Sequence, residues 1–251
     1  MILTIDIGNT ALKMGVFDDT DATGFTCYRW MWAEWDATDP LQALAELPIR
    51  RAGLIGVVPS RIPVVQERVR AIWGVEVEVF RTNTPMPLGM GYATPETLGM
   101  DRLVAALAGW TLYGESGKGL VVVDAGTAVN VEVVDAAGTY RGGAIAPGTK
   151  LMTQALARGT AQLPEIQPVF PEVAIGNSTQ TCLQSGIMFM LADGLAGMIR
   201  RFRQELGTDV VVVATGGWGE MLRHELPEIQ HHDAFLVLRG LRILMETETI
   251  T

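Results

Sequence analysis

The chain has 251 residues, of which 48% are apolar, with a formal net charge of −9 at pH 7 and a sequence pI near 4.9. This length and apolar content suffice for one large domain or two of ordinary size. The acidic balance argues against nucleic acid or an acidic membrane as a partner, because either would need a clustered basic surface.

The start of the chain and its cysteines favour a soluble, cytoplasmic protein. The chain opens on an apolar run, residues 2–5, with no basic residue before Lys13, so the arrangement of a secretory signal is missing. The longest apolar stretch, around residues 187–199, is too short to span a bilayer. Cys27 and Cys182 are too few for a disulfide framework or a metal site, and they fit a reducing compartment.

Short β-rich runs alternate with helical patterns in the first half of the chain, which predicts an α/β fold. The predicted strands cover residues 2–5, 13–17, 54–58 and 75–80, and a helix is predicted over residues 101–113. Three glycines within residues 114–119 indicate a connector. We therefore expect an N-terminal lobe over residues 1–115 and a C-terminal lobe over residues 116–251.

The second half repeats this order of elements and implies a second, similar lobe. Its predicted elements are strands over residues 120–123 and 129–134, a glycine-rich turn over residues 141–148, helices near residues 149–157 and 178–205, and a strand over residues 209–214.

An Asp-x-Gly motif occurs once in each half. Asp6-Ile7-Gly8-Asn9-Thr10 and Asp124-Ala125-Gly126-Thr127 both follow an apolar strand and precede a strand of alternating pattern, at an offset of 124 − 6 = 118 residues. Such an offset is about one small domain and favours a duplication. The alternative is two unrelated β-turns, since Asp and Gly are both common turn residues.

The two motifs have the composition of phosphate-binding hairpins. Glycine lets the backbone approach a ligand closely with its N–H groups free to face phosphate oxygens, and Thr10 and Thr127 can add hydroxyl donors. A carboxylate beside phosphate requires a cation between them, so Asp6 and Asp124 are candidate cation ligands. Lys13 can meet a nucleotide phosphate. The alternatives are Asx-turns for the aspartates and a solvated strand lysine.

The loop over residues 92–102 ends where a helix is predicted to begin. Asp101 and Arg102 thus stand at a helix N-terminus, where an Asp is commonly an N-cap and an Arg is commonly solvated. Their pairing beside Gly99 favours a chemical role. Asp101 can accept a hydroxyl proton, and Arg102 can hold a substrate carboxylate through paired hydrogen bonds.

Other motifs are less specific. The glycine-rich residues 141–148 and the run Thr215-Gly216-Gly217 suit nucleotide contacts or plain turns equally well. No Ser-His-Asp order, Cys-His pair or H-E-x-x-H motif is present, which weakens hydrolase hypotheses.

Taken in order, the motifs resemble those of the type III pantothenate kinases, from Met1 to about Gly219. The segments that carry the resemblance are Asp6-Ile7-Gly8-Asn9-Thr10 with Lys13, Pro95-x-x-x-Gly99-x-Asp101-Arg102, Asp124-x-Gly126-Thr127-Ala128, Gly142-Gly143-x-Ile145-x-Pro147-Gly148, Thr160-Ala161-Gln162-Leu163-Pro164, and Gly176-Asn177-Ser178-Thr179 with Gly186.

The resemblance implies an α/β protein of two ribonuclease-H-like lobes with a duplicated phosphate hairpin, which is the actin-like ATPase architecture. It also implies transfer of the γ-phosphoryl group of ATP to the primary hydroxyl of pantothenate, which gives 4′-phosphopantothenate and opens coenzyme A biosynthesis. The implied cofactors are Mg²⁺ with ATP and a monovalent cation, K⁺ or NH₄⁺. The implied assembly is a homodimer.

The resemblance also implies a role for each matching residue. Asp101 is similar to the catalytic base, and Asp124 to the ligand of the monovalent cation. Thr179 is similar to a substrate contact made across the dimer interface. The pantothenate loop is represented by Tyr92, Gly99, Met100 and Arg102, together with Asp101 itself. The ATP site is represented by Asp6, Gly8, Asn9, Thr10, Lys13 and Thr127.

The chain departs from the usual family pattern at four positions. Asn130 and Glu132 stand where Thr and Asp are common, Ser178 where Asn is usual, and Trp218 where a small or acidic residue is common.

Two alternatives to a pantothenate kinase remain open at the level of the sequence. One is another small-molecule kinase or phosphatase of the same architecture, against which the motif over residues 95–102 argues. The other is a non-catalytic regulatory or accessory protein that keeps the fold. The intact Asp6, Asp101 and Asp124 argue against the second.

Overall fold

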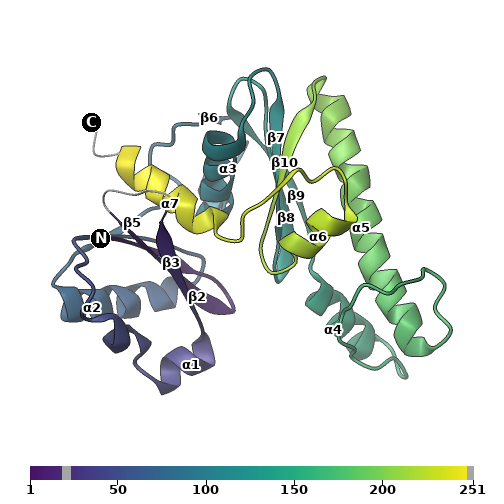
Figure 1. Ribbon diagram of the computed structural model, residues 1–251, viewed down its shortest axis with the longest axis horizontal. Helices are drawn as coiled ribbons and strands as arrows, with labels where there is room; N and C mark the ends of the chain where they lie inside the picture. The colour runs from purple at the N-terminus through teal and green to yellow at the C-terminus, as the bar shows by residue number, and fades with distance from the viewer. Residues whose placement is uncertain (19–23, 248–251) are drawn as a thin grey trace. The chain divides into compact units, whose positions relative to one another are not determined.

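A computed structural model of the chain describes residues 1–18 and 24–247. The chain forms two compact units (Figure 1). Unit 1 comprises Met1–Leu112 together with the chain from Phe235 onward, and unit 2 comprises Tyr113–Ala234. The expected boundary near residue 115 lies close to this division, whereas the last part of the chain belongs to the first unit instead of the second.

Unit 1 is built on a five-stranded mixed sheet in the order β3-β2-β1-β4-β5. β1 pairs antiparallel with β2 and parallel with β4, while β3 adds antiparallel to β2 and β5 adds parallel to β4. The strands of unit 1 are β1 (Ile2–Ile7), β2 (Ala11–Phe17), β3 (Phe25–Met31), β4 (Arg51–Gly56), β5 (Val77–Val79) and the short β6 (Gly89–Met90). Its helices are α1 (Trp32–Ala37), α2 (Ile62–Trp73), α3 (Met100–Tyr113) and α7 (Leu236–Thr247), with short 3₁₀ turns at Pro40–Leu44, Pro59–Arg61 and Pro95–Thr97.

The core of unit 1 follows from the alternation of side chains along β1. Ile5 and Ile7 are fully buried and pack with Val65 and Val69 of α2 on one face of the sheet. Successive strand residues point to opposite faces, so Asp6 points to the other face. The hydrophobic packing of its two neighbours therefore fixes the direction of this carboxylate.

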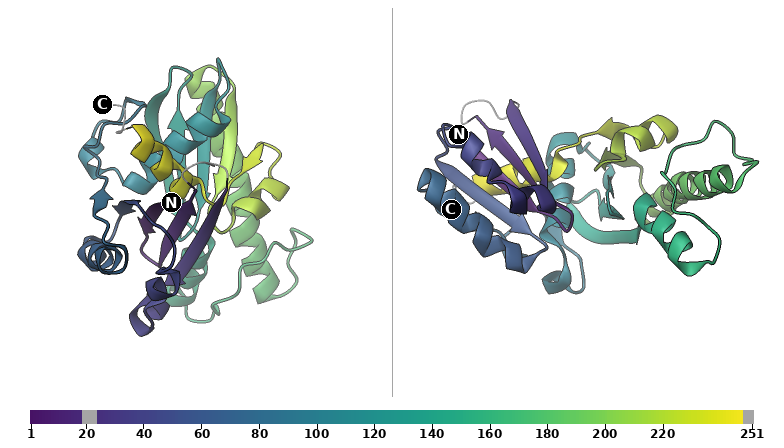
Figure 2. Two further views of the ribbon diagram at one scale, coloured as in Figure 1. Left: turned by 60° about the vertical axis from the view of Figure 1, so that its left-hand side comes forward. Right: turned by 90° about the horizontal axis from the view of Figure 1, so that it is seen from below.

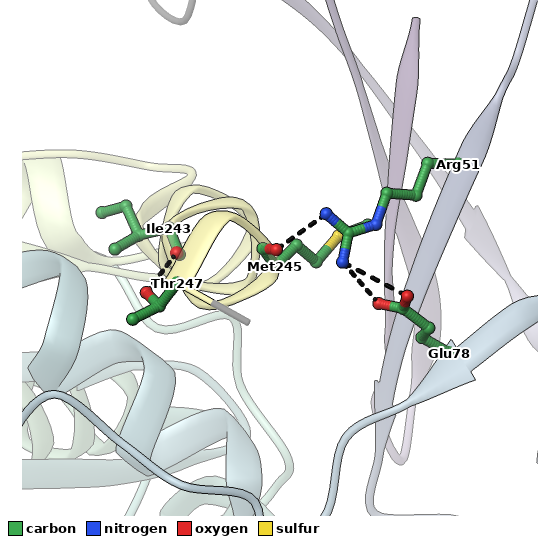
Figure 3. A network of polar contacts seen from close by, with 5 residues as sticks. All are labelled: Arg51, Glu78, Ile243, Met245 and Thr247. Atoms are coloured by element: carbon green, nitrogen blue, oxygen red, sulfur yellow. Dashed lines mark hydrogen bonds and ion pairs between the residues drawn. The ribbon is translucent and has the colours of Figure 1, made fainter. Parts of the chain in front are cut away.

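Helix α7 contacts β1, β2 and β4 within unit 1. The sulfur of Met245 lies so close to Gly53 of β4 that a Cβ at Gly53 would collide with it. The Arg51 guanidinium donates a hydrogen bond of 2.7 Å to the Met245 carbonyl and lies 2.9 Å from the Glu78 carboxylate (Figure 3). Arg51 thus satisfies a carbonyl in the last turn of α7, where helical partners are missing.

These contacts explain why the division of the chain differs from the expected one. Residues 235–247 were expected in the C-terminal lobe with the rest of residues 116–251. They instead form part of unit 1, because the apolar face of α7 is buried there, with Leu241 and Leu244 fully buried. The local sequence of a helix does not show which distant segment of the chain the helix packs against.

Unit 2 repeats the sheet of unit 1. Its strands lie in the order β11-β10-β7-β8-β9. β7 pairs antiparallel with β8 and parallel with β10, β9 adds antiparallel to β8, and β11 adds parallel to β10. The strands are β7 (Gly119–Ala125), β8 (Ala128–Val134), β9 (Thr139–Pro147), β10 (Val210–Thr215) and β11 (His231–His232), and the helices are α4 (Thr149–Gly159), α5 (Thr179–Leu206) and α6 (Gly219–Glu225).

Strand order and direction are therefore identical in the two units, strand for strand. This agreement supports the duplication predicted from the two Asp-x-Gly motifs, since each motif connects the equivalent pair of strands, β1 to β2 and β7 to β8. The arrangement is the ribonuclease-H-like one. Figure 2 shows the two sheets from further directions.

The glycine-rich turn predicted over residues 141–148 is wrong. Most of this segment is part of strand β9, Thr139–Pro147, which has a register shift in its pairing with β8. Gly143 lies against the Val131 carbonyl with no room for a Cβ, and Gly142 has a φ of 96°. The glycines serve a close, bulged strand pairing and do not end the strand.

Helix α5 differs from the expectation for its apolar stretch. It has 28 residues and a window of mean hydropathy 1.4, so it is long and apolar enough by length and composition to cross a membrane. Core helices of globular proteins meet the same condition. Leu191, Leu195 and Ile199 of α5 are buried in one cluster with the valines of β7, β8 and β10, so the buried face of the helix packs in the core of unit 2.

Candidate active site

The first hairpin carries a buried ion pair. Asp6, near the end of β1, is 5% exposed and stands opposite Lys13 of β2 in the antiparallel register. The Lys13 ammonium lies 3.5 Å from the Asp6 carboxylate, and the lysine side chain is 38% exposed. The pair therefore joins a sheltered anion to a cation that solvent or a ligand can reach.

The turn of this hairpin is closed by its own backbone. The Gly8 N–H donates to the Ala11 carbonyl at 3.1 Å, and in the second hairpin the Gly126 N–H donates to the Ala128 carbonyl at 2.9 Å. The N–H of each glycine is thus used to close its own turn, as in other tight hairpins. That other backbone N–H groups of the hairpins face phosphate stays a prediction. Asn9 is exposed beyond Gly8.

The start of α3 positions the predicted base. Asp101 lies in the first turn of α3, and its Oδ1 accepts the backbone N–H of Arg102 at 3.0 Å. A Cβ at Gly99 would collide with the same carboxylate oxygen. The absence of a Cβ at Gly99 therefore leaves room for the carboxylate in this orientation.

Unit 1 brings Asp6 and Asp101 into one electrostatic environment. Burial raises the pKa of the Asp6 carboxyl above its ordinary value, the Lys13 ammonium lowers this pKa in part, and the charge of Asp101 raises it. Like charges disfavour each other only at short range in a partly buried site. The charge of Asp101, in the first turn of α3, therefore acts on the first hairpin, although the two are far apart in sequence.

The second hairpin forms a close backbone cradle around Asp124. Asp124 lies on β7 opposite Asn130 of β8 and beside Thr215 of β10. Gly216 has a φ of 82°, and a Cβ there would lie 2.5 Å from Asp124 Oδ1 and 2.7 Å from the Ala125 carbonyl. Only glycine allows this approach.

Two more backbone bonds hold the second hairpin. The Trp218 N–H donates to the Ala125 carbonyl at 3.1 Å, and the Gly148 N–H donates to the Thr127 carbonyl at 3.0 Å. The segment after β10 and the end of β9 therefore both attach to this turn. This leaves Thr127 exposed at its tip.

The departures from the family pattern have defined places in unit 2. Glu132 is 1% exposed and accepts the Tyr140 hydroxyl at 2.5 Å, while Asn130 faces Asp124 across the β7–β8 pair. Ser178 caps α5, with its hydroxyl accepting the Thr181 N–H at 3.2 Å. Glu132 and Ser178 therefore have structural partners of their own.

The remaining predicted substrate residues are divided between the two units. Tyr92 is half-buried in the segment before α3, and Met100, the first residue of α3, is buried. Thr179 is the exposed first residue of α5 in unit 2.

A sequence model of the type III pantothenate kinase family matches residues 2–201 of the chain. The chain belongs to the type III pantothenate kinases. Type III pantothenate kinase 1 of Symbiobacterium thermophilum is 37% identical over 263 residues, which cover 98% of this chain and 96% of the relative. The type III pantothenate kinase of Frankia casuarinae is 34% identical, over 98% of this chain and 99% of the relative.

Solved structures support the fold of this pantothenate kinase family member. A ROK family protein from Streptococcus pneumoniae, solved with sucrose, superposes with a TM-score of 0.53 at 15% identity, over 100% of this chain and 99% of that one. A Campylobacter jejuni protein described as a candidate Baf family transcriptional activator gives a TM-score of 0.62 at 18% identity, over 99% and 100% of the chains. These likenesses bear on the fold alone, which is the expected actin-like ATPase architecture.

Some features of the site have no clear sequence signal. The approach of Gly216 to Asp124 could be suspected only from the run Thr215-Gly216-Gly217, which suits a plain turn equally well. The hydrogen bond from the Trp32 indole N–H to the first hairpin likewise has no signal in the sequence.

The raised pKa of Asp6 predicts a gain of stability on its neutralisation. The Asp6 carboxyl has a higher pKa in the folded chain than in an unfolded chain, where its pKa is near 3.8. The protonated form therefore contributes to the stability of the fold below about pH 3.8, and this contribution is lost as the pH rises through the pKa of the folded chain. Asp6→Asn should therefore raise the melting temperature near neutral pH, with the gain shrinking towards about pH 4.

Calorimetry or circular dichroism across this pH range measures the difference. The exposed Asp193 on α5 offers a matched control, because Asp193→Asn should leave the melting temperature unchanged. A melting temperature of Asp6→Asn at or below that of the parent near neutral pH would show that the ion pair with Lys13 outweighs the burial of the carboxylate.

Proposed function

We propose that this chain transfers the γ-phosphoryl group of ATP to the primary hydroxyl of pantothenate and so makes 4′-phosphopantothenate, the first step of coenzyme A biosynthesis. One observation carries the proposal beyond family membership. The charge of Asp101, from the motif over residues 95–102, acts on the buried Asp6 of the first hairpin. This interaction supports placing the group suited to take a proton and the hairpin suited to hold phosphate at one site in unit 1.

The first hairpin is proposed to hold the ATP phosphates through Asn9, Thr10 and Lys13, with Gly8 closing the turn on which they lie and Asp6 orienting the lysine. Phosphoryl transfer depends on positioning and on neutralising phosphate charge, with little covalent help from the protein. The exposed ammonium of Lys13 supplies such neutralisation, and Mg²⁺ bound with ATP supplies more.

The loop before α3 is proposed to bind pantothenate. Asp101 takes the proton of the pantothenate hydroxyl, and the hydroxyl oxygen forms a bond to the γ-phosphorus of ATP. The bond between that phosphorus and the bridging oxygen breaks, and ADP leaves. Arg102 holds the pantothenate carboxylate through paired hydrogen bonds. Tyr92, Gly99 and Met100 shape the loop around the substrate.

Asp124 is proposed to bind the monovalent cation, K⁺ or NH₄⁺, and Thr127 to contact ATP. Two oxygens around Asp124 support this role, because Asp124 Oδ1 and the Ala125 carbonyl oxygen both lie against Gly216, at 2.5 and 2.7 Å from the position that a Cβ would take there. Oxygen atoms from a carboxylate and from carbonyl groups are suitable ligands for a hard cation.

We predict that the purified protein with Mg-ATP and pantothenate releases ADP and yields a product heavier by one phosphoryl group only when K⁺ or NH₄⁺ is present. Panthenol, which has the same primary hydroxyl but lacks the carboxylate, should react far more slowly because Arg102 has no anion to hold. A coupled ADP assay and mass spectrometry measure both. ADP release with glucose and none with pantothenate would point to a sugar kinase, and no turnover across a range of monovalent salts would contradict the proposal.

Replacing the proposed base tests the chemistry directly. Asp101→Asn keeps the size of the side chain but cannot accept the hydroxyl proton, so kcat should fall by about 10² to 10⁴. Circular dichroism should show an unchanged fold. The exposed Glu67 on α2 provides a matched control in the same unit, and Glu67→Gln should keep the parent rate. Parent-like turnover by Asp101→Asn would leave Asp101 with a structural role in the first turn of α3.

We further propose that the chain acts as a homodimer in the cytoplasm. Unit 2 exposes large apolar side chains, with Ile175 at 88%, Met190 at 75% and Val173 at 65%. The segment holding Val173 and Ile175 is tied to α5, because the Ser185 hydroxyl donates to the Ala174 carbonyl at 2.5 Å. An exposed apolar surface of this kind is typical of a protein interface. Thr179 of one subunit would then contact pantothenate bound by the other.

The dimer proposal predicts a mass in solution twice the chain mass of 27.1 kDa. Met190→Glu and Ile175→Glu should each lower this mass towards that of one chain in sedimentation velocity runs, because an interface cannot bury an unpaired carboxylate without cost. Val64→Glu, at an exposed apolar residue of α2, is the control and should leave the mass unchanged. A single-chain mass of the parent protein at micromolar concentration would exclude a stable dimer.

A further inference from the structure

Trp32 makes two hydrogen bonds to the turn of the first hairpin. Its indole N–H donates to the Gly8 carbonyl at 2.9 Å, and its backbone N–H donates to the Thr10 carbonyl at 3.4 Å. Trp32 is the first residue of α1, so the start of this helix abuts the turn that connects β1 to β2. The two carbonyls that it holds flank Asn9 on both sides.

Fixing the Gly8 carbonyl also fixes the next N–H group. The Gly8 carbonyl and the Asn9 N–H belong to one planar trans peptide, in which the C=O and N–H bonds point in opposite directions. With its carbonyl directed at Trp32, this peptide turns the Asn9 N–H away from the indole. Within the described residues no group of the chain accepts a hydrogen bond from that N–H, and Asn9 is exposed. A backbone donor in this state is available to an anion.

Trp32 itself is held in a fixed orientation. The Arg61 guanidinium lies over the indole ring at 4.6 Å from its centroid, and the Trp35 ring meets it edge-on at 6.3 Å. Arg61 is in turn fixed by two hydrogen bonds to the Asp36 carboxylate, of 2.5 and 2.8 Å. Ring, guanidinium and carboxylate thus form a chain of contacts that ends at the Gly8 carbonyl.

We propose that Trp32 is a positioning residue for nucleotide binding, which holds the turn of the first hairpin so that the Asn9 N–H is presented to a phosphate group of ATP. This inference rests on the proposed role of the hairpin in holding ATP. Trp32 acts through the peptide between Gly8 and Asn9 and touches neither substrate. The Arg61 guanidinium, which lies over the indole ring, helps to hold Trp32 in the orientation that places its N–H at the Gly8 carbonyl.

The test is Trp32→Phe, which removes the indole N–H and keeps an aromatic ring for Arg61 and Trp35. We expect the KM for ATP to rise roughly three- to tenfold, the ratio that corresponds to losing one neutral hydrogen bond. The KM for pantothenate should stay within about twofold of the parent value. The Kd of a non-hydrolysable Mg-ATP analogue, measured by titration calorimetry, should rise by the same factor as the KM for ATP.

Trp30→Phe is the matched control, because the Trp30 ring stacks on Tyr28 in the same unit and, among the described residues, its indole N–H makes no hydrogen bond to the turn of the first hairpin. It should leave both KM values unchanged. If Trp32→Phe does not fold, Arg61→Gln decides the question with the indole intact, since losing the guanidinium over the ring should raise the KM for ATP selectively.

The outcomes separate this inference from the proposed function. A parent protein that phosphorylates pantothenate while folded Trp32→Phe keeps the parent KM for ATP would overturn the role of Trp32 alone. Equal increases in both KM values would also overturn it, because they indicate general damage to unit 1. A parent protein that fails to bind the analogue at all would instead contradict the proposed function.

Discussion

The burial of the Asp6 carboxylate is the constraint on which the organisation of unit 1 depends. The sheet fixes its direction, because Ile5 and Ile7 on either side must enter the core. A charge placed there needs a counter-ion, and the antiparallel register supplies Lys13 directly opposite. The negative charge of Asp101 acts against this neutralisation. The site therefore holds two carboxylates and one accessible ammonium, a balance that a bound cation and phosphate can change.

The two sheets have the same topology, but the β1–β2 turn and the β7–β8 turn differ in detail. In the first, the closing hydrogen bond runs from Gly8 to Ala11, and in the second from Gly126 to Ala128, so the first turn is one residue longer. The extra length leaves Asn9 projecting between two anchored carbonyls. The shorter second turn accepts backbone hydrogen bonds from the residue that follows β9 and from the segment after β10. The same fold thus presents two turns of different length and different hydrogen bonding.

Local patterns in the sequence predicted the hairpins, the loop before α3 and most strands, because alternation and turn composition are local properties. The same reasoning failed where glycine acts through distant neighbours. Gly142 and Gly143 suggest a turn until Val131 is known to lie beside them, and Gly216 shows its role only once Asp124 is placed. The sequence likewise did not predict that α7 belongs to unit 1. The close packing of Met245 on Gly53 joins residues that are far apart in the sequence.

The return of α7 to unit 1 has a consequence for the order of folding during synthesis. The sheet of β1 to β5 precedes unit 2 in the sequence, yet it is covered in part by α7, which follows unit 2. Unit 2 lies between these two pieces in sequence and can fold as an uninterrupted segment. During synthesis, the apolar surface of unit 1 that α7 covers therefore stays uncovered until the segment after unit 2 has been made.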